Sequence, residues 1–502
     1  MKNNFLCLVA ALMACSCGCA VKSGRRSVDR FSNHASNGKP VAIESVGKAT
    51  DNQLVVDSAV IPASGSLDER DSGDTNVVIA AVDSIPQNQL IETPLASPNG
   101  MTLEELVSLA LNNNPAVKEL AATTQKAAGY RTQVGLYANP TVGYQAQQLA
   151  DRGTDQHLLF AEQEFATAGK LELNRRVQNE ALRAQLQELE AQKLRVATDI
   201  QTLYYTALGY QKQLILIKEF RGLMDKGYEL AQLRLKAAEG SKIDVLQTRV
   251  QRNEIDLAYR QTQARYDASW REIAAVAGIQ GLPPTILVSE FPLPSETMTW
   301  DSVASTIVAS SPEYAASQAR ISQARAELER HGVQAVPNIT TQLGAGFDNG
   351  TDSGLINLQV GLPIPVFNKN QGNIAAARAE YCRALMEAKR IENAIRARLA
   401  IISNDFETSL EAVNVYGNEI LPGAKEALTL AETAYKAGEM DFIQLLVARR
   451  TYFDSNLQYV TAQAQLAAAK AKVDGFALSG SLEAVIDRSG SDSLRGLTFS
   501  QQ

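Results

Sequence analysis

One stretch of the chain, from Thr141 to Leu282, contains no proline and repeats an apolar residue at every seventh position through its centre. Gaps of four and three residues place these positions on one face of a helix. We predict a single helix from Leu171 to Leu235, which at 1.5 Å per residue is about 100 Å long. Such a rod has to pack against other long helices, as in an ordinary coiled coil or a larger assembly. The apolar positions are Leu182, Leu186, Leu189, Val196, Ile200, Leu203, Ala207, Tyr210, Leu214 and Ile217.

Two stretches of sequence occur twice. TLEELVSLALNNNP at Thr102–Pro115 is matched by TWDSVASTIVASSP at Thr299–Pro312, and KAAEGSKIDVLQTR at Lys236–Arg249 by KAGEMDFIQLLVAR at Lys436–Arg449. A period this long indicates a duplicated unit rather than a solenoid. We predict repeats at 101–281 and 299–480, a proline-rich linker at 282–298 and a C-terminal tail at 481–502.

Each repeat contains two short segments of alternating apolar and polar residues ahead of its long helix. We predict strands near 141–149 and 156–165 in the first repeat, and near 338–347 and 354–363 in the second, where the turn Asp348-Asn349-Gly350 separates them. Strands of about ten residues cross a bilayer when they are tilted. A half-buried soluble hairpin has the same period, so the strands alone leave both readings open.

Four strands are too few to close a membrane barrel, because each unpaired backbone group in lipid costs several kcal/mol. If the strands span a membrane, a ring of identical chains has to supply the missing ones. Three copies would give twelve strands.

The N-terminus has the pattern of a bacterial lipoprotein signal. Lys2 precedes a short apolar run, Phe5–Ala14, which is too short to span a bilayer as a helix. Leu12-Met13-Ala14-Cys15 resembles a lipobox, so we predict signal peptide and lipobox at 1–19, acylation at Cys15 and a flexible linker at 20–100. Cys17 and Cys19 are weaker acceptor candidates. A plain secretory signal with incidental cysteines is the alternative.

Composition narrows the function classes. The formal net charge is −7, which argues against a nucleic-acid partner. The three histidines in the chain are too few for an easily built multi-histidine metal centre. The sequence shows no nucleotide-binding loop and no catalytic constellation. We therefore expect no enzyme activity, no cofactor and no resident metal.

Prolines and asparagines mark where strands and helices should begin and end. Pro363 and Pro365 remove ladder donors and stop the last strand, and Asn368 and Asn370 suit a turn and a helix N-cap. Pro422, inside the second long helical stretch, should kink it.

These features together resemble the TolC-like outer-membrane efflux protein family over about Met101–Leu478. The resemblance rests on the duplicated helix–hairpin–helix plan, on YKAGE at 435–439, and on PIPVFNKNQGN at 363–373, which with FATAGK at 165–170 is most similar to the cobalt–zinc–cadmium and copper efflux branch. It implies a mainly α fold with membrane strands: a homotrimer with a twelve-stranded β-barrel in outer-membrane lipid above a long periplasmic α-barrel. It also implies a periplasmic adaptor protein and an inner-membrane resistance–nodulation–division (RND) pump as partners. The expected function is a passive exit duct, for heavy-metal cations by the branch similarity.

The second duplicated motif should form helix–helix turns at the far end of the long helices. Gly240 and Gly438 would adopt the left-handed conformation that ends a helix. The resemblance adds that these turns form the periplasmic mouth and the tips that meet the adaptor.

Acidic residues lie in or beside both turns, and a threefold ring of them would favour cations. Solvated tip charges without a function are the alternative. The family often has Asp at the positions of Gln444 and Val447, which weakens the expectation of an acidic constriction. The acidic residues are Glu239, Asp244, Glu439 and Asp441.

Other functions fit the same residues less well. One is a duct of the same family for drugs or secreted polypeptides. Another is a lipid-anchored periplasmic coiled-coil protein without a pore.

Overall fold

The structure is a computed structural model that describes residues 100–149, 153–238, 240–292, 294 and 298–499. The chain divides into two units, Met1–Ile85 and Pro86–Gln502, and every described residue lies in the second. The predicted signal segment, its candidate acceptors Cys15, Cys17 and Cys19, and nearly all of the predicted linker lie outside the described residues.

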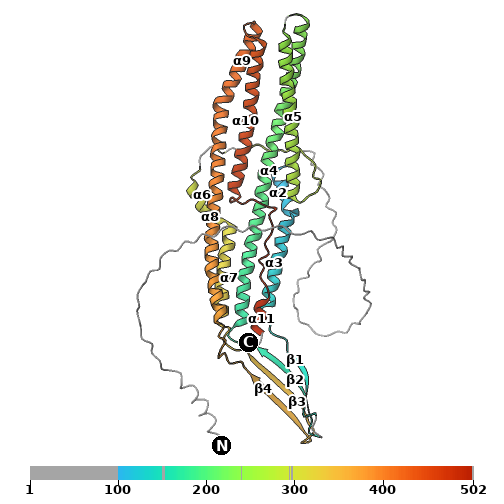
Figure 1. Cartoon of the computed structure of the whole chain (residues 1–502), viewed down its shortest axis with the longest axis vertical. Coiled ribbons are helices and arrows are strands. Elements are labelled where there is room, and N and C mark those ends of the chain that lie inside the picture. Colours follow the sequence, from blue (N-terminus) through green and yellow to red (C-terminus); the bar gives the residue numbers. More distant parts are fainter. Residues whose placement is uncertain (1–99, 150–152, 239, 293, 295–297, 500–502) are drawn as a thin grey trace, which may run out of the picture. The chain divides into compact units, whose positions relative to one another are not determined.

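Within the second unit, one order of elements occurs twice: two shorter helices, a β-hairpin, then long helices (Figure 1). The first series is α2 (Leu103–Asn113), α3 (Pro115–Gln133), β1 (Thr141–Gln147), β2 (Gln156–Phe165), α4 (Lys170–Lys236) and α5 (Lys242–Ala277). The second series is α6 (Trp300–Ser310), α7 (Pro312–Gly332), β3 (Ile339–Asp348), β4 (Ser353–Gly361), α8 (Gln371–Val415), the π-helix η1 (Tyr416–Ile420), α9 (Leu421–Ala437) and α10 (Phe442–Asp474), and α11 (Ser493–Phe499) follows. The predicted fold class, long helices with four strands per chain, is confirmed.

Helix α4 is the 67-residue rod that the proline-free heptads predict, and its observed ends lie one residue beyond the predicted ones. It begins after Gly169, whose φ of 65° turns the chain out of the sheet. Its buried face follows the predicted seam in the upper half, where Val196, Ile200 and Ile217 are buried.

In the lower half of α4 the predicted seam is wrong. Leu186 is 46% exposed, and the buried positions include the alanines 181, 184 and 191 and the glutamines 178, 185 and 192. There α4 packs against both α3 and α7. Small side chains allow helix axes to approach closely, so alanines lie at these contacts, whereas Leu186 lies on the exposed side of the helix.

The second long helical stretch is interrupted near Pro422, as predicted, and the interruption has an identifiable geometry. The π-helix η1 lies directly before α9, and the amide of Leu421 donates to the carbonyl of Tyr416, five residues back. Proline has no N–H to donate to the α-helical ladder, so a carbonyl in the preceding turn loses its usual partner. The wider turn of the π-helix changes which amides the carbonyls in front of the proline accept from.

The four strands form one antiparallel sheet in the order β1-β2-β3-β4. The β2–β3 pair joins the two halves of the unit, with Gln156 opposite Asp348 and Phe165 opposite Ile339. The hairpins therefore build a single sheet at one end of the helices (Figure 1).

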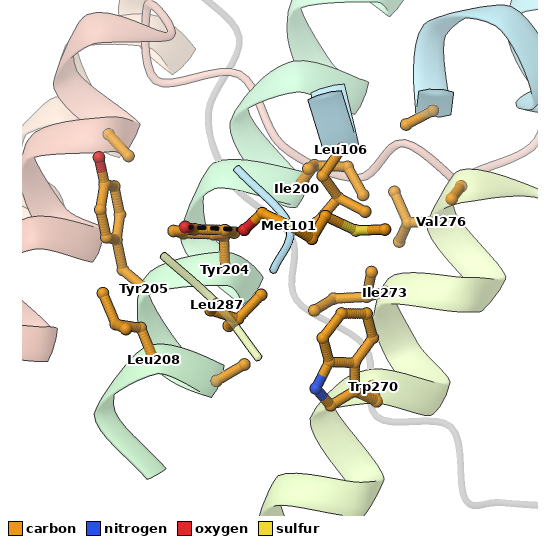
Figure 2. Close-up of a cluster of buried hydrophobic side chains, with 14 of the residues drawn as sticks. Met101, Leu106, Ile200, Tyr204, Tyr205, Leu208, Trp270, Ile273, Val276 and Leu287 are labelled. Carbon is orange, nitrogen blue, oxygen red and sulfur yellow. Dashed lines mark hydrogen bonds between the residues drawn. The ribbon is translucent and has the colours of Figure 1, made fainter. Parts of the chain in front are cut away.

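The largest buried cluster lies where α2, α4 and α5 meet. Figure 2 shows Trp270 and Ile273 of α5 facing Leu106 of α2 and Ile200 of α4. The linker contributes Leu287, which pairs with Met101 in a parallel bridge. The part of the predicted linker that follows the first repeat thus packs into the core. Among the described residues, no helix combines the length and apolar character needed to cross a membrane.

Candidate functional site

One face of the sheet exposes its large apolar side chains. Strand register places Tyr144, Leu159, Ala345 and Ile356 in one row across all four strands, and Ile356 is 78% exposed. Apolar surface of this kind on a folded unit indicates a lipid or protein partner. The exposed apolar residues of this face are Val142, Tyr144, Leu159, Phe165, Ile339, Leu343, Phe347, Ile356, Leu358 and Val360.

The opposite face carries polar and small residues. Glu162, Gln342 and Gln359 form one row of it. The glycines make room for the apolar side chains that remain on this face: a Cβ on Gly143 would lie 2.5 Å from the ring of Phe160. The two faces therefore suit lipid on one side and water on the other.

Strands β1 and β4 form the two edges of the sheet, and neither has a second strand partner among the described residues. Unpaired strand edges recruit further strands. Together with the apolar face, they make this sheet an incomplete wall.

Where the sheet meets the helices, two buried cations hold the junction between them. Lys170, at the start of α4, donates from Nζ to the carbonyl of Val336 (2.6 Å) and to Oδ1 of Asn338 (2.7 Å). Arg330 of α7 is fully buried and donates to Asn174 Oδ1 (2.6 Å) and Thr498 Oγ1 (2.9 Å). Burial lowers the pKa of Lys170, and it lowers the pKa of Arg330 to about 10.

The C-terminal tail runs along α4, and a ladder of polar side chains holds it. Gln178 and Gln192 donate to the carbonyls of Ser491 (2.9 Å) and Ser481 (2.8 Å), and Asp199 accepts from the amide of Ser481 (2.8 Å). This role of the tail was not predicted from the sequence. The available signal was the polar heptad 178, 185, 192 and 199, which lies beside the apolar one.

Between Ser481 and Ser491 of the tail, Arg488 joins a charged cluster around Glu387 of α8. Glu387 accepts from Arg383 at 2.8 Å and Arg488 at 3.2 Å, and Arg320 lies 3.5 Å away. Burial by itself raises the pKa of Glu387, but these three arginines outweigh burial, so the pKa is lowered.

The turn after α9 ends the helix as predicted at Gly438, whose φ is 75°. Gly438 and Glu439 donate to the carbonyls of Tyr435 (3.1 Å) and Ala434 (2.9 Å), which completes a Schellman motif.

The same prediction is wrong for Gly240. Among the described residues of the turn after α4, the left-handed angle lies at Ala238, with a φ of 60°. Gly240 instead lies close to the helix end, where an added Cβ would lie 3.1 Å from Cβ of Arg234. Gly240 is thus needed for space and not for its backbone angle.

The structure separates the acidic tip residues into different settings. Asp244 accepts from the amide of Ser241 (3.0 Å) in a capping box at the start of α5. Glu439 and Asp441 are exposed, and Asp441 makes no side-chain cap bond at the start of α10. Glu239 lies outside the described residues. Among the described residues, no group of three or more His, Cys, Asp or Glu could hold a metal ion.

Two polar contacts and an apolar cluster connect the hairpin α4–α5 with the hairpin α9–α10. Arg234 donates to the hydroxyl of Tyr435 (2.9 Å), and Arg450 pairs with Glu254. Farther from the turns, the rings of Phe220 and Phe453 stack with centroids 4.2 Å apart. The tips of one chain therefore form one connected body.

The chain has recognisable relatives. Residues 303–476 match the family described as outer membrane efflux protein. The cobalt-zinc-cadmium resistance protein CzcC of Cupriavidus metallidurans is 23% identical over 274 residues, which is 54% of this chain and 65% of CzcC, so the match spans just under two thirds of that relative. The pyoverdine export outer membrane protein OpmQ of Pseudomonas putida is 25% identical over 434 residues, 76% of this chain and 87% of OpmQ.

The fold also has solved counterparts. The crystal structure of CusC, described in terms of folding and transmembrane channel formation, superposes with a TM-score of 0.63 at 16% identity, over 75% of this chain and 92% of CusC. At this identity the likeness concerns the fold. That fold has the long helices and the antiparallel strands described above.

Proposed function

We propose that this chain, whose residues 303–476 match the outer membrane efflux protein family, is the outer-membrane exit duct of a tripartite efflux system. It conducts substrates passively from the periplasm to the exterior, fed by an inner-membrane RND pump through a periplasmic adaptor protein. The observation that carries the proposal is the four-stranded sheet, with one exposed apolar face, one polar face and two unpaired edges.

The sheet supports a homotrimer. Three copies joined edge to edge give a closed barrel of twelve strands, in which every backbone group has a partner. The apolar face then meets outer-membrane lipid and the polar face lines the water-filled lumen. The long helices would form the periplasmic α-barrel below.

Heavy-metal cations are the proposed substrates, because CzcC is named for resistance to cobalt, zinc and cadmium. The match to OpmQ, named for pyoverdine export, favours an organic substrate as the second candidate. The exposed carboxylates of Glu439 and Asp441 support cations, since threefold symmetry would repeat both around the mouth.

The proposal includes acylation at Cys15, with Cys17 and Cys19 as weaker acceptors. The lipid would anchor the mature N-terminus in the outer membrane. Mass spectrometry of the mature N-terminus identifies the acylated cysteine.

A deletion strain tests the substrate. Loss of the gene should raise sensitivity to cobalt, zinc, cadmium or copper salts, and the full chain supplied on a plasmid should restore resistance. Unchanged metal sensitivity together with defective export of a siderophore would replace the metal proposal with the organic one.

A further inference from the structure

The segment after β4 presents three large apolar side chains to solvent. Ile364, Val366 and Phe367 are 77%, 62% and 94% exposed, and we call them the β4 knob. Pro363 and Pro365 remove two backbone donors, and the amide of Val366 is satisfied by the carbonyl of Ile364 at 2.9 Å. The amide of Val366 would therefore keep its partner if the knob were buried.

Before β1, at the other edge of the sheet, the surface is hollow. A groove of about 600 Å³ lies between the residues that precede β1 and one side of α11. We call it the β1 groove, and its lining is Ala138, Asn139, Asp492, Ser493, Arg495, Gly496 and Phe499.

The walls of the groove are fixed in position. Arg495 donates to the carbonyls of Leu136 (2.6 Å) and Tyr137 (3.3 Å), which ties α11 to the chain entering β1. Its guanidinium lies 5.4 Å from the ring centroid of Phe499. The groove thus offers a cation and an aromatic face, a setting that suits another aromatic ring.

We propose that the β4 knob of one copy seats in the β1 groove of the next copy around the ring. The inference rests on the proposed function, since it needs the sheet edges to pair between copies. Antiparallel pairing of β4 with the next copy's β1 brings the end of β4 beside the start of β1, so knob and groove lie only a few residues from the paired edges. A closed ring requires this kind of contact, in which two different surfaces of one chain meet.

Lipid is the alternative partner for the knob, because lipid would also cover its apolar side chains. The polar residues that follow at once, Asn368, Lys369 and Asn370, favour a shallow protein groove over deep insertion. The groove lining includes Asp492 and Arg495, whose charges suit such polar neighbours.

A photo-crosslinker separates the occupants. The full chain carries p-benzoylphenylalanine in place of Phe367 and is irradiated in intact membranes before extraction. We expect an adduct of two copies whose cross-link maps to 136–139 or 492–499. The same probe in place of Phe347, exposed on the apolar face of a central strand, is the matched control and should give no cross-linked copies.

Adducts at position 367 that contain only phospholipid, or that map to any other segment, would overturn the inference. Native mass spectrometry of the unmodified chain separates its failure from that of the proposed function. A trimer without the mapped cross-link would refute only the contact between knob and groove. A monomer would refute that contact and the proposed function.

A substitution in the groove gives a second readout. Nothing lies within 4 Å of a Cβ added to Gly496, so the protomer tolerates a side chain there. Gly496→Phe should fill the groove and weaken trimer assembly roughly tenfold, while Gly496→Ala should leave it unchanged. Equal trimer yields for both variants would contradict the proposal.

Discussion

At the scale of single residues, close contacts inside the sheet and buried charges beneath it decide which side chains the fold accepts. Gly346 in β3 lies so close to β2 that a Cβ would overlap the carbonyl oxygen of His157. Arg330 is enclosed by neutral acceptors that the sequence did not point to, because they come from segments far apart in the chain.

Gly346→Ala should destabilise the β2–β3 pair by about 1 to 3 kcal/mol, because the backbone of β2 has to move. Gly361→Ala is the matched control, since nothing lies within 4 Å of a Cβ at that position. The measurement is thermal unfolding of the detergent-extracted protein. Equal midpoints for the two variants would contradict the predicted overlap.

Glu387 makes the tail contact pH-dependent. Because its folded pKa is lowered from 4.5, its carboxylate stabilises the fold above about pH 4.5, and this stabilisation is lost as the pH falls through the folded value. Burial raises the pKa of the nearby Glu327, so this group changes stability with pH in the opposite direction. Glu327 is unchanged in the Glu387→Gln variant described next.

We expect Glu387→Gln to lower stability by about 2 kcal/mol at pH 7 and to show a smaller loss between pH 5 and pH 3 than the unmodified chain. Thermal unfolding across that range measures both effects. Parallel pH profiles would show that Glu387 does not contribute the expected linkage.

At the scale of elements, local rules predicted most of the helices and strands. The bounds of α4 followed from periodicity and the absence of proline, since both act along the chain itself. The lower seam of α4 and the path of the tail could not be predicted, because both depend on which distant helix lies alongside. Glycines in the turns were harder still, since Ala238 takes the left-handed angle that Gly240 was expected to adopt.

Asparagine at the start of α8 shows the same limit. Asn370 occupies the predicted N-cap position with a φ of 59°, but its side chain makes no cap bond. It donates instead to the carbonyl of His331 at 2.9 Å, while Asn368 accepts from the amide of Asn370 at 3.0 Å. Tertiary contact with α7 outweighed the local preference for capping.

The α9–α10 turn depends on the backbone angle of Gly438. Gly438→Ala should destabilise the tip by about 1 kcal/mol through that angle, because nothing lies within 4 Å of the added Cβ. Gly423→Ala in the same helix should be neutral or stabilising. Hydrogen exchange at the amides of the turn reports the difference, and equal exchange in both variants would rule out the backbone cause.

At the scale of the whole molecule, the described unit combines one four-stranded sheet with long helices that end in two helical hairpins. The sheet faces and the duplicated plan could be predicted from the sequence. The proposed acidic mouth could be predicted only as residue positions, because a ring of these residues would exist only after assembly.

Conductance tests the acidic mouth. The double variant Glu439→Gln, Asp441→Asn should lower cation selectivity in planar bilayers, because it removes two carboxylates per copy from the proposed ring. Glu426→Gln, an exposed change within α9 and away from the turn, is the control. Unchanged selectivity in the double variant would make these residues ordinary solvated charges.

The central claim is that several copies close the sheet within a membrane. Native mass spectrometry of the full chain, extracted from outer membranes in detergent, measures this most directly. The account predicts a complex of three copies. A single copy that remains soluble without detergent would contradict it.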